Sequence, residues 1–240
     1  MLLDSDQSSF GKSELCVRIN RLMDTKETAL QDLEAVLPCN RLEAVIIPKI
    51  ESAANVPFVS RMMDALAGDR DIRIIAAVES AVGMLNIQEI AATKGRLDAL
   101  VFASEDYCAD LELIRTPGTA ELLYPGSQLV TAAKAYGLQA IDMVHIQFRD
   151  LEGLAEECER GQEIGFTGKQ AIHPNQVATI HETFSPSTKD VNFAVRVVDA
   201  YVATTARGKG VCVADGIADA PVYKWAVKIL KRAEMAGMQG

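Results

Sequence analysis

Two acidic side chains that end neighbouring apolar segments are the strongest chemical signal in the sequence. Glu79 ends the run IRIIAAVE, and Asp106 ends the run ALVFASED roughly one strand–helix repeat later. If these runs are adjacent parallel strands, both carboxylates lie at the same rim of the sheet. Two carboxylates together with water suit Mg²⁺, whereas Zn²⁺ would favour His or Cys ligands. Spacing alone leaves open that the two acids cap the helices that follow.

Basic residues end the two preceding apolar segments. Arg18 lies near the end of LCVRIN, and Lys49 lies near the end of AVIIPKIE. A guanidinium beside a divalent cation can bind a carboxylate at two points and stabilise a developing oxyanion. The alternative is a buried ion pair with Glu79 or with Asp142. Asp142 either supports a neighbouring ligand or is an ordinary acid at a strand end, and we favour the second interpretation.

The three histidines and the acids of the C-terminal segment give weaker signals. His145 and His173 each end a predicted strand, and His181 falls on a predicted surface helix. Their spacing indicates no Ser-His-Asp or Cys-His arrangement. Asp215 and Asp219 belong to the glycine-rich run ADGIADAP, where an acid usually forms a turn.

Six short β-rich segments alternate with segments of helical periodicity, which is typical of a parallel sheet covered by helices. The repeat is about 30 residues, which suits a (β/α)₈ barrel. A doubly wound open sheet is the structural alternative, but no G-x-G-x-x-G or P-loop motif follows a strand. The predicted strands are residues 15–20, 44–51, 72–79, 99–106, 140–145 and 166–173. The predicted helices between them are 55–66, 84–93, 126–136 and 151–164.

The pattern therefore predicts an α/β protein with a TIM-type barrel shortened to six βα units. Two units are expected to be missing before the first strand. Residues 1–185 are expected to form this partial barrel and to carry the metal site. Residues 186–240 are expected to form a C-terminal arm of two helices, 187–206 and 222–236, joined by a glycine-rich segment.

Composition excludes several classes of partner. The formal charge of −9 and the pI near 4.9 argue against nucleic acid, because polyphosphate would be repelled. The five cysteines are scattered and never spaced as C-x-x-C, which argues against disulfides and structural zinc. No apolar run reaches the ~20 residues that a membrane-spanning helix needs. We expect a soluble protein in a reducing compartment.

Several longer runs carry a family resemblance: IIPKIES, VESAVGMLN, FASEDYCADL, GLQAIDMVHIQFRD, GFTGKQAIHPNQ and DGIADAP. In these runs the chain resembles the citrate lyase β-subunit-like proteins of the HpcH/HpaI aldolase/citrate lyase superfamily. The resemblance covers most of the chain, from residue 15 to about residue 221. It implies a TIM barrel that assembles as a homotrimer.

The resemblance also implies roles for individual residues. Glu79 and Asp106 match the family's Mg²⁺ ligands, and Arg18 matches its catalytic, substrate-binding arginine. Residues Ile172 and His173 match a pair that contacts substrate. Asp219 corresponds to a general acid/base that reaches the site of a neighbouring subunit, although the motif DGIAD is one residue shorter here.

The implied activity is Mg²⁺-dependent cleavage of a 3-hydroxyacyl-CoA such as (S)-citramalyl-CoA to acetyl-CoA and pyruvate. The partners are thus an acyl-CoA and a small α-keto acid, and malate or citramalate synthesis is an expected side reaction. The alternatives are malyl-CoA cleavage or thioester hydrolysis, the β subunit of a citrate lyase complex, or an inactive shortened member. The expected location is the mitochondrial matrix in a eukaryote and the cytoplasm otherwise.

Overall fold

The computed structural model describes residues 13–22, 26–93, 95–205, 212–213, 216–217 and 220–238. The chain divides into two compact units, Met1–Val177 and Ala178–Gly240, which are described separately. Asp219, Asp215 and most of the glycine-rich segment around them lie outside the described residues.

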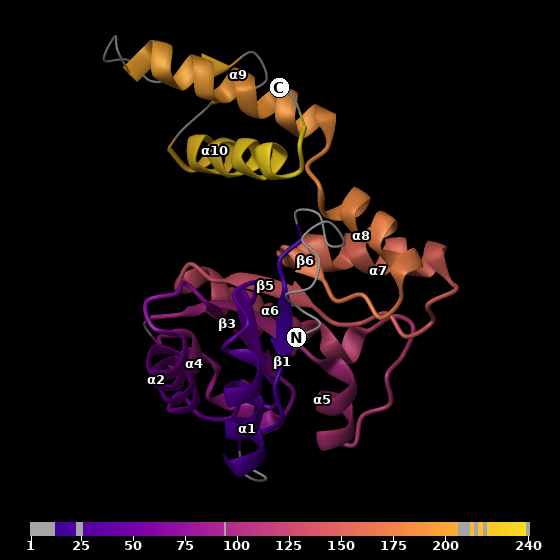
Figure 1. Ribbon diagram of the computed structural model, residues 1–240. Helices are drawn as coiled ribbons and strands as arrows, with labels where there is room; N and C mark the ends of the chain where they lie inside the picture. The colour runs from indigo at the N-terminus through magenta and orange to yellow at the C-terminus, as the bar shows by residue number, and fades with distance from the viewer. Residues whose placement is uncertain are drawn as a thin grey trace. The chain divides into compact units, whose positions relative to one another are not determined.

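The first unit is built on one sheet of six parallel strands, ordered along the sheet as they are along the chain. The strands are β1 (Cys16–Arg18), β2 (Ala44–Ile47), β3 (Arg73–Val78), β4 (Leu97–Phe102), β5 (Gln139–Asp142) and β6 (Gly168–Lys169). All six predicted strands are confirmed, but each is shorter than its apolar pattern. The sheet curls into a half-barrel, so the predicted α/β fold of six consecutive TIM-barrel units is confirmed (Figure 1).

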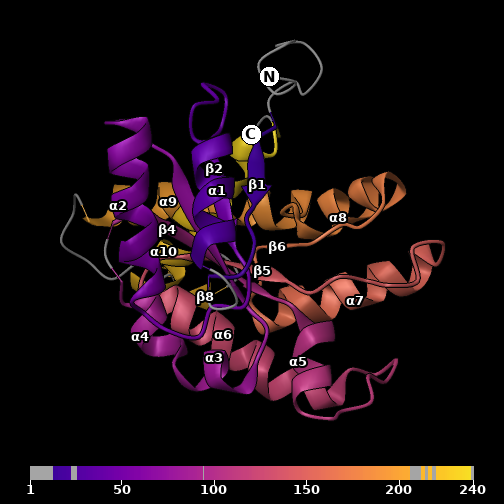
Figure 2. The same cartoon turned by 60° about the horizontal axis from the view of Figure 1, so that its bottom comes forward.

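Helices connect the strands and cover the sheet, as Figure 2 shows for α2, α4, α6 and α7. They are α1 (Lys26–Val36), α2 (Asn55–Ala67), α3 (Ala81–Leu85), α4 (Ile87–Ala91), α5 (Ser104–Asp110), α6 (Leu123–Ala135) and α7 (Leu151–Ile164). Short 3₁₀ turns, η2 (Ala120–Leu122) and η3 (Pro174–Gln176), precede α6 and α8 (Val177–Phe184). The helices bury apolar residues such as Leu33, Val59 and Leu129, and the strands bury residues such as Ile74 and Leu100. This layer fixes the directions in which the strand ends project.

The helix predicted at residues 84–93 is two helices. α3 ends at Leu85, and α4 begins at Ile87. Between them the Asn86 side chain donates a hydrogen bond to the Glu51 carbonyl oxygen at 2.8 Å. Asparagine favours helix boundaries because its side chain competes for backbone hydrogen bonds.

The second unit contains two long helices, α9 (Thr188–Thr205) and α10 (Ala220–Met235), which pack against each other. Ala194, Val197 and Ala226 form the buried centre of their interface. Two short strands, β7 (Cys212–Val213) and β8 (Gly216–Ile217), pair antiparallel. Among the described residues, no helix has the length and apolar character needed to cross a bilayer.

Candidate metal and substrate site

Three residues gather where β2, β3 and β4 end. Glu79 directly follows β3 and is only 4% exposed. Asp106 lies in the first turn of α5, just after β4. Lys49 follows β2, and its Nζ lies 2.8 Å from Asp106 Oδ1. Because adjacent parallel strands end at the same rim, residues far apart in the sequence come together here.

The pKa of Glu79 is affected by the charged residues that lie near it at this rim. Burial raises the pKa of the Glu79 carboxyl, and repulsion by Asp106 raises it further. Three interactions act in the opposite direction: a hydrogen bond from the Lys49 backbone N–H and the positive charges of Arg18 and Lys49. They lower the pKa of Glu79, but the net pKa stays above its usual value. Arg18, the exposed last residue of β1, therefore acts electrostatically on the same carboxylate as Asp106.

Neither acid is the N-cap residue of the helix that follows it, although Asp106 lies in the first turn of α5, where a helix N-terminus favours negative charge. Ser80 is the N-cap of α3, where its Oγ accepts a hydrogen bond from the Gly83 N–H. The N-cap of α5 is Ala103, which makes no side-chain capping bond. Asp106 instead pairs with Lys49. Contacts with Lys49, and no N-cap bond, thus hold the carboxylates of Glu79 and Asp106 at this rim.

The donor set of the acid pair fits Mg²⁺. The described residues contain no group of three or more His, Cys, Asp and Glu side chains that could hold a metal. A site of two carboxylates suits Mg²⁺, because this ion keeps water and substrate oxygens among its ligands. Zn²⁺ would need nitrogen or sulfur donors that are not grouped here.

Glu51 also lies at this rim, although no sequence motif pointed to it. Its Oε1 accepts from Ser80 Oγ at 2.9 Å, and its Oε2 lies 3.1 Å from an Arg21 guanidinium nitrogen. Arg21 follows β1 and Ser80 follows Glu79, so Glu51 ties together the segments after β1, β2 and β3. The only available signal was a second charged residue in the run PKIES.

The pair Ile172 and His173 lies on a separate loop after β6. Ile172 is 52% exposed, and its N–H donates to Gln176 Oε1. The exposed His173 ring stacks on Phe148 with centroids 4.9 Å apart, and its Nδ1 lies 2.6 Å from Asn175 Oδ1. Both side chains are therefore surface groups of unit 1, beyond β5 from the acid pair.

Asp142 takes part in a buried charge network instead of pairing with Arg18 or Lys49. Lys169 Nζ lies 2.8 Å from Asp142 Oδ2 and 2.7 Å from Glu157 Oε1. Arg115 adds a second cation to Glu157 at 3.1 Å, and His145 Nδ1 lies 3.3 Å from the same carboxylate. Burial raises the pKa of Asp142. For Glu157, Lys169 and Arg115 outweigh burial, so its pKa falls below the usual value.

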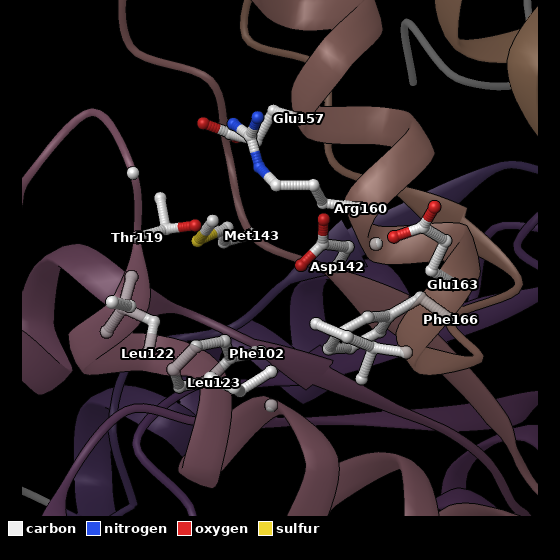
Figure 3. Close-up of a pocket in the computed structure, with 15 residues that line it drawn as sticks. Phe102, Thr119, Leu122, Leu123, Asp142, Met143, Glu157, Arg160, Glu163 and Phe166 are labelled. Atoms are coloured by element: carbon white, nitrogen blue, oxygen red, sulfur yellow. The ribbon is translucent and has the colours of Figure 1, made fainter.

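A cavity of about 280 Å³ lies beside this network, between α6, α7 and the end of β5 (Figure 3). Its walls are largely apolar and include Phe102, Leu122, Met143 and Phe166. Asp142 and Glu157 contribute polar atoms, whereas the acid pair at β3 and β4 does not line it. The cavity is therefore distinct from the candidate metal site.

Comparisons with known proteins agree with this architecture. The family model described as HpcH/HpaI aldolase/citrate lyase matches residues 5–174, and the model of a C–C bond lyase of the TIM-barrel fold matches residues 121–238. Human mitochondrial citramalyl-CoA lyase is 36% identical over 230 residues, which cover 90% of this chain and 67% of that protein. Citrate lyase subunit beta of Leuconostoc mesenteroides is 32% identical, covering 93% of this chain and 75% of its own.

A solved structure of a citrate lyase-like protein is also similar to this chain. Mycobacterium tuberculosis CitE, in complex with magnesium, acetoacetate and coenzyme A, superposes with a TM-score of 0.70 at 30% identity. The match covers 91% of this chain and 78% of that one. Together, the parallel half-barrel and these matches establish that the chain belongs to the HpcH/HpaI aldolase/citrate lyase family of carbon–carbon lyases.

Proposed function

We propose that the chain is a Mg²⁺-dependent carbon–carbon lyase acting on a 3-hydroxyacyl-CoA, with (S)-citramalyl-CoA as substrate and acetyl-CoA and pyruvate as products. The observation that carries this proposal is the convergence of Glu79 and Asp106 at the rim of the half-barrel, with Lys49 and Arg18 beside them. The similarity to citramalyl-CoA lyase supports the substrate class. The magnesium and coenzyme A bound to the similar CitE protein support the cofactor and the thioester partner.

The reaction requires three events. A proton leaves the tertiary hydroxyl, the carbon–carbon bond breaks to release the keto acid, and the acetyl carbon takes up a proton. Mg²⁺, when bound, would supply Lewis acidity to the oxygens of the keto-acid half. Glu79 and Asp106 are the residues that would hold it. Arg18 would bind the substrate carboxylate and offset its charge. Addition of acetyl-CoA to a keto acid in the reverse direction, followed by hydrolysis of the thioester to release CoA, would give a malate or citramalate synthase side activity.

Three further residues complete the proposed site. Asp219 is the proposed general acid/base that exchanges the proton with the acetyl carbon. Ile172 and His173, both exposed after β6, are the proposed substrate contacts. We also propose a homotrimer and, for a eukaryotic source, a location in the mitochondrial matrix. The similarity to mitochondrial citramalyl-CoA lyases supports the location.

The test is turnover of (S)-citramalyl-CoA by purified protein with Mg²⁺. We expect Glu79→Gln and Asp106→Asn each to lower kcat/KM on the order of 10³-fold, since each removes a metal ligand. Glu105→Gln is the matched control: this acid adjoins Asp106 but pairs with Arg115, and its loss should change the rate less than about threefold. Undiminished Mg²⁺-dependent turnover in Glu79→Gln would show that the metal assignment is wrong.

A second candidate is a citrate lyase β subunit, which the similarity to that subunit supports. Comparing citramalyl-CoA, malyl-CoA and citryl-CoA as substrates distinguishes the candidates. A clear preference for citryl-CoA would favour the β-subunit role. Turnover of none of the three, together with no calorimetric response to Mg²⁺ and acetyl-CoA, would favour an inactive member.

A further inference from the structure

Lys49 touches both acids of the candidate metal site through different parts of one residue. Its backbone N–H donates to the Glu79 carboxylate, and its ammonium lies 2.8 Å from Asp106 Oδ1. The residue adopts φ of +48°, the left-handed region that non-glycine residues rarely occupy. The buried Pro48 precedes it, at the point where β2 has ended. The turn therefore directs the N–H toward β3 while the side chain reaches α5.

This double contact offsets the repulsion between the two acids. Glu79 and Asp106 carry like charges at the same rim, and both contact Lys49. The Lys49 ammonium supplies a charge-assisted hydrogen bond to Asp106 at short range. Arg18 adds a positive charge near Glu79. Lys49 thus provides a cation for a pair of carboxylates at the same rim.

We propose that Lys49 is a built-in counter-cation that holds the acid pair together and competes with the divalent metal for Asp106. This inference rests on the proposed Mg²⁺ site and adds the group that sets its affinity. A divalent cation bound to Asp106 would share this carboxylate with the ammonium, whose positive charge beside Oδ1 repels a second cation. The arrangement stabilises the acid pair at the cost of weaker metal binding.

One substitution at Lys49 should change thermal stability and Mg²⁺ affinity in opposite directions. Lys49→Met retains the length of the side chain and removes its charge. The metal-free variant should melt at a lower temperature than wild type, because the two carboxylates lose their counter-ion. Its affinity for Mg²⁺ should rise, and an increase of roughly three- to tenfold is expected for a half-exposed ion pair. Lys49→Arg keeps the charge and should stay near wild type in both measurements.

The experiment is calorimetric titration of the full chain with Mg²⁺ alone, combined with thermal melts with and without Mg²⁺. Lys228→Met, the same change at an exposed lysine of α10, is the control and should alter neither quantity. Equal or weaker Mg²⁺ binding by Lys49→Met would overturn the competition. Lys49→Asn suits the left-handed backbone and also removes the charge. It should reproduce the tighter binding if Lys49→Met fails to fold.

The same data separate this inference from the proposed function. If Mg²⁺ binds wild type and Glu79→Gln abolishes the binding, the metal site stands. Unchanged affinity in Lys49→Met and Lys49→Asn then refutes only the role of Lys49. If no Mg²⁺ binds to wild type or to the Lys49 variants, the metal site and this inference fail together.

Discussion

Replacing Lys169 by methionine should destabilise unit 1 strongly, because this lysine neutralises two buried carboxylates. Its side chain is 0% exposed, and those of Asp142 and Glu157 are 4% and 7% exposed. Removing one partner of such a group costs about 3–5 kcal/mol. Arg115 still contacts Glu157, so we expect the lower end, about 3 kcal/mol. In a chain of this size that corresponds to a fall in Tm of roughly 6–12 °C.

The loss should depend on pH with a definite sign. Without Lys169, the already raised folded-state pKa of Asp142 rises further, and the lowered pKa of Glu157 rises as well. As the pH falls, the folded state of the variant then takes up protons more readily than the unfolded chain. Its loss of free energy of unfolding relative to wild type therefore becomes smaller at low pH. The free energy of unfolding of Lys169→Met should therefore lie closer to wild type at pH 5.5 than at pH 8.

Urea denaturation followed by circular dichroism at both pH values measures this effect. Lys169→Met/Asp142→Asn should recover part of the loss at pH 8, because it removes one of the uncompensated charges. The control Lys228→Met should stay within about 0.5 kcal/mol of wild type. A loss below about 1 kcal/mol for Lys169→Met at pH 8, or a loss independent of pH, would refute the reasoning.

Three further predictions test other parts of unit 1. Gly83→Ala should destabilise the protein by about 1–3 kcal/mol in urea denaturation and weaken Mg²⁺ binding. The reason is that the new Cβ would lie 2.5 Å from the Ile50 carbonyl oxygen. Wild-type stability and Mg²⁺ affinity would contradict this close contact. Arg70→Met should cost about 2–3 kcal/mol, since the guanidinium donates to three backbone carbonyls of the α1–β2 loop, and a change below about 0.5 kcal/mol would argue against these bonds. Cys158 should resist iodoacetamide at pH 8 in folded protein and react after denaturation, because it is buried and its pKa is raised to about 11; rapid labelling of the native thiol would contradict its burial.

The sequence predicted the fold well because its signals are local and repeated. The six apolar runs are the six strands, and the helix predicted at residues 151–164 is α7 with the same bounds. The strand ends were overestimated, because the polar residues that finish each run belong to turns and helix starts. Asp106, for example, continues the run of β4 in sequence but lies in α5.

The site could be predicted only where strand order alone brings residues together. Glu79, Asp106, Lys49 and Arg18 end consecutive strands, so parallel topology is enough to group them. Lys169 and Asp142 also stand at the ends of strands, but they are buried in a separate network of charged side chains. Their partner Glu157 comes from α7, and helix packing against the sheet has no signature in strand spacing. The left-handed backbone at Lys49 also has no signal in its residue type.

The bridge made by Glu51 has an evolutionary consequence. One carboxylate receives Arg21 on one oxygen and Ser80 on the other, while the same residue's carbonyl receives Asn86. A lineage that exchanged Glu51 for a shorter or neutral side chain would remove an acceptor from Arg21 and from the Ser80 hydroxyl. In an alignment of relatives, these positions should therefore covary, with Arg21 and Ser80 changing when Glu51 changes. Independent drift at the three positions would mean that neighbouring groups can take over the bridge.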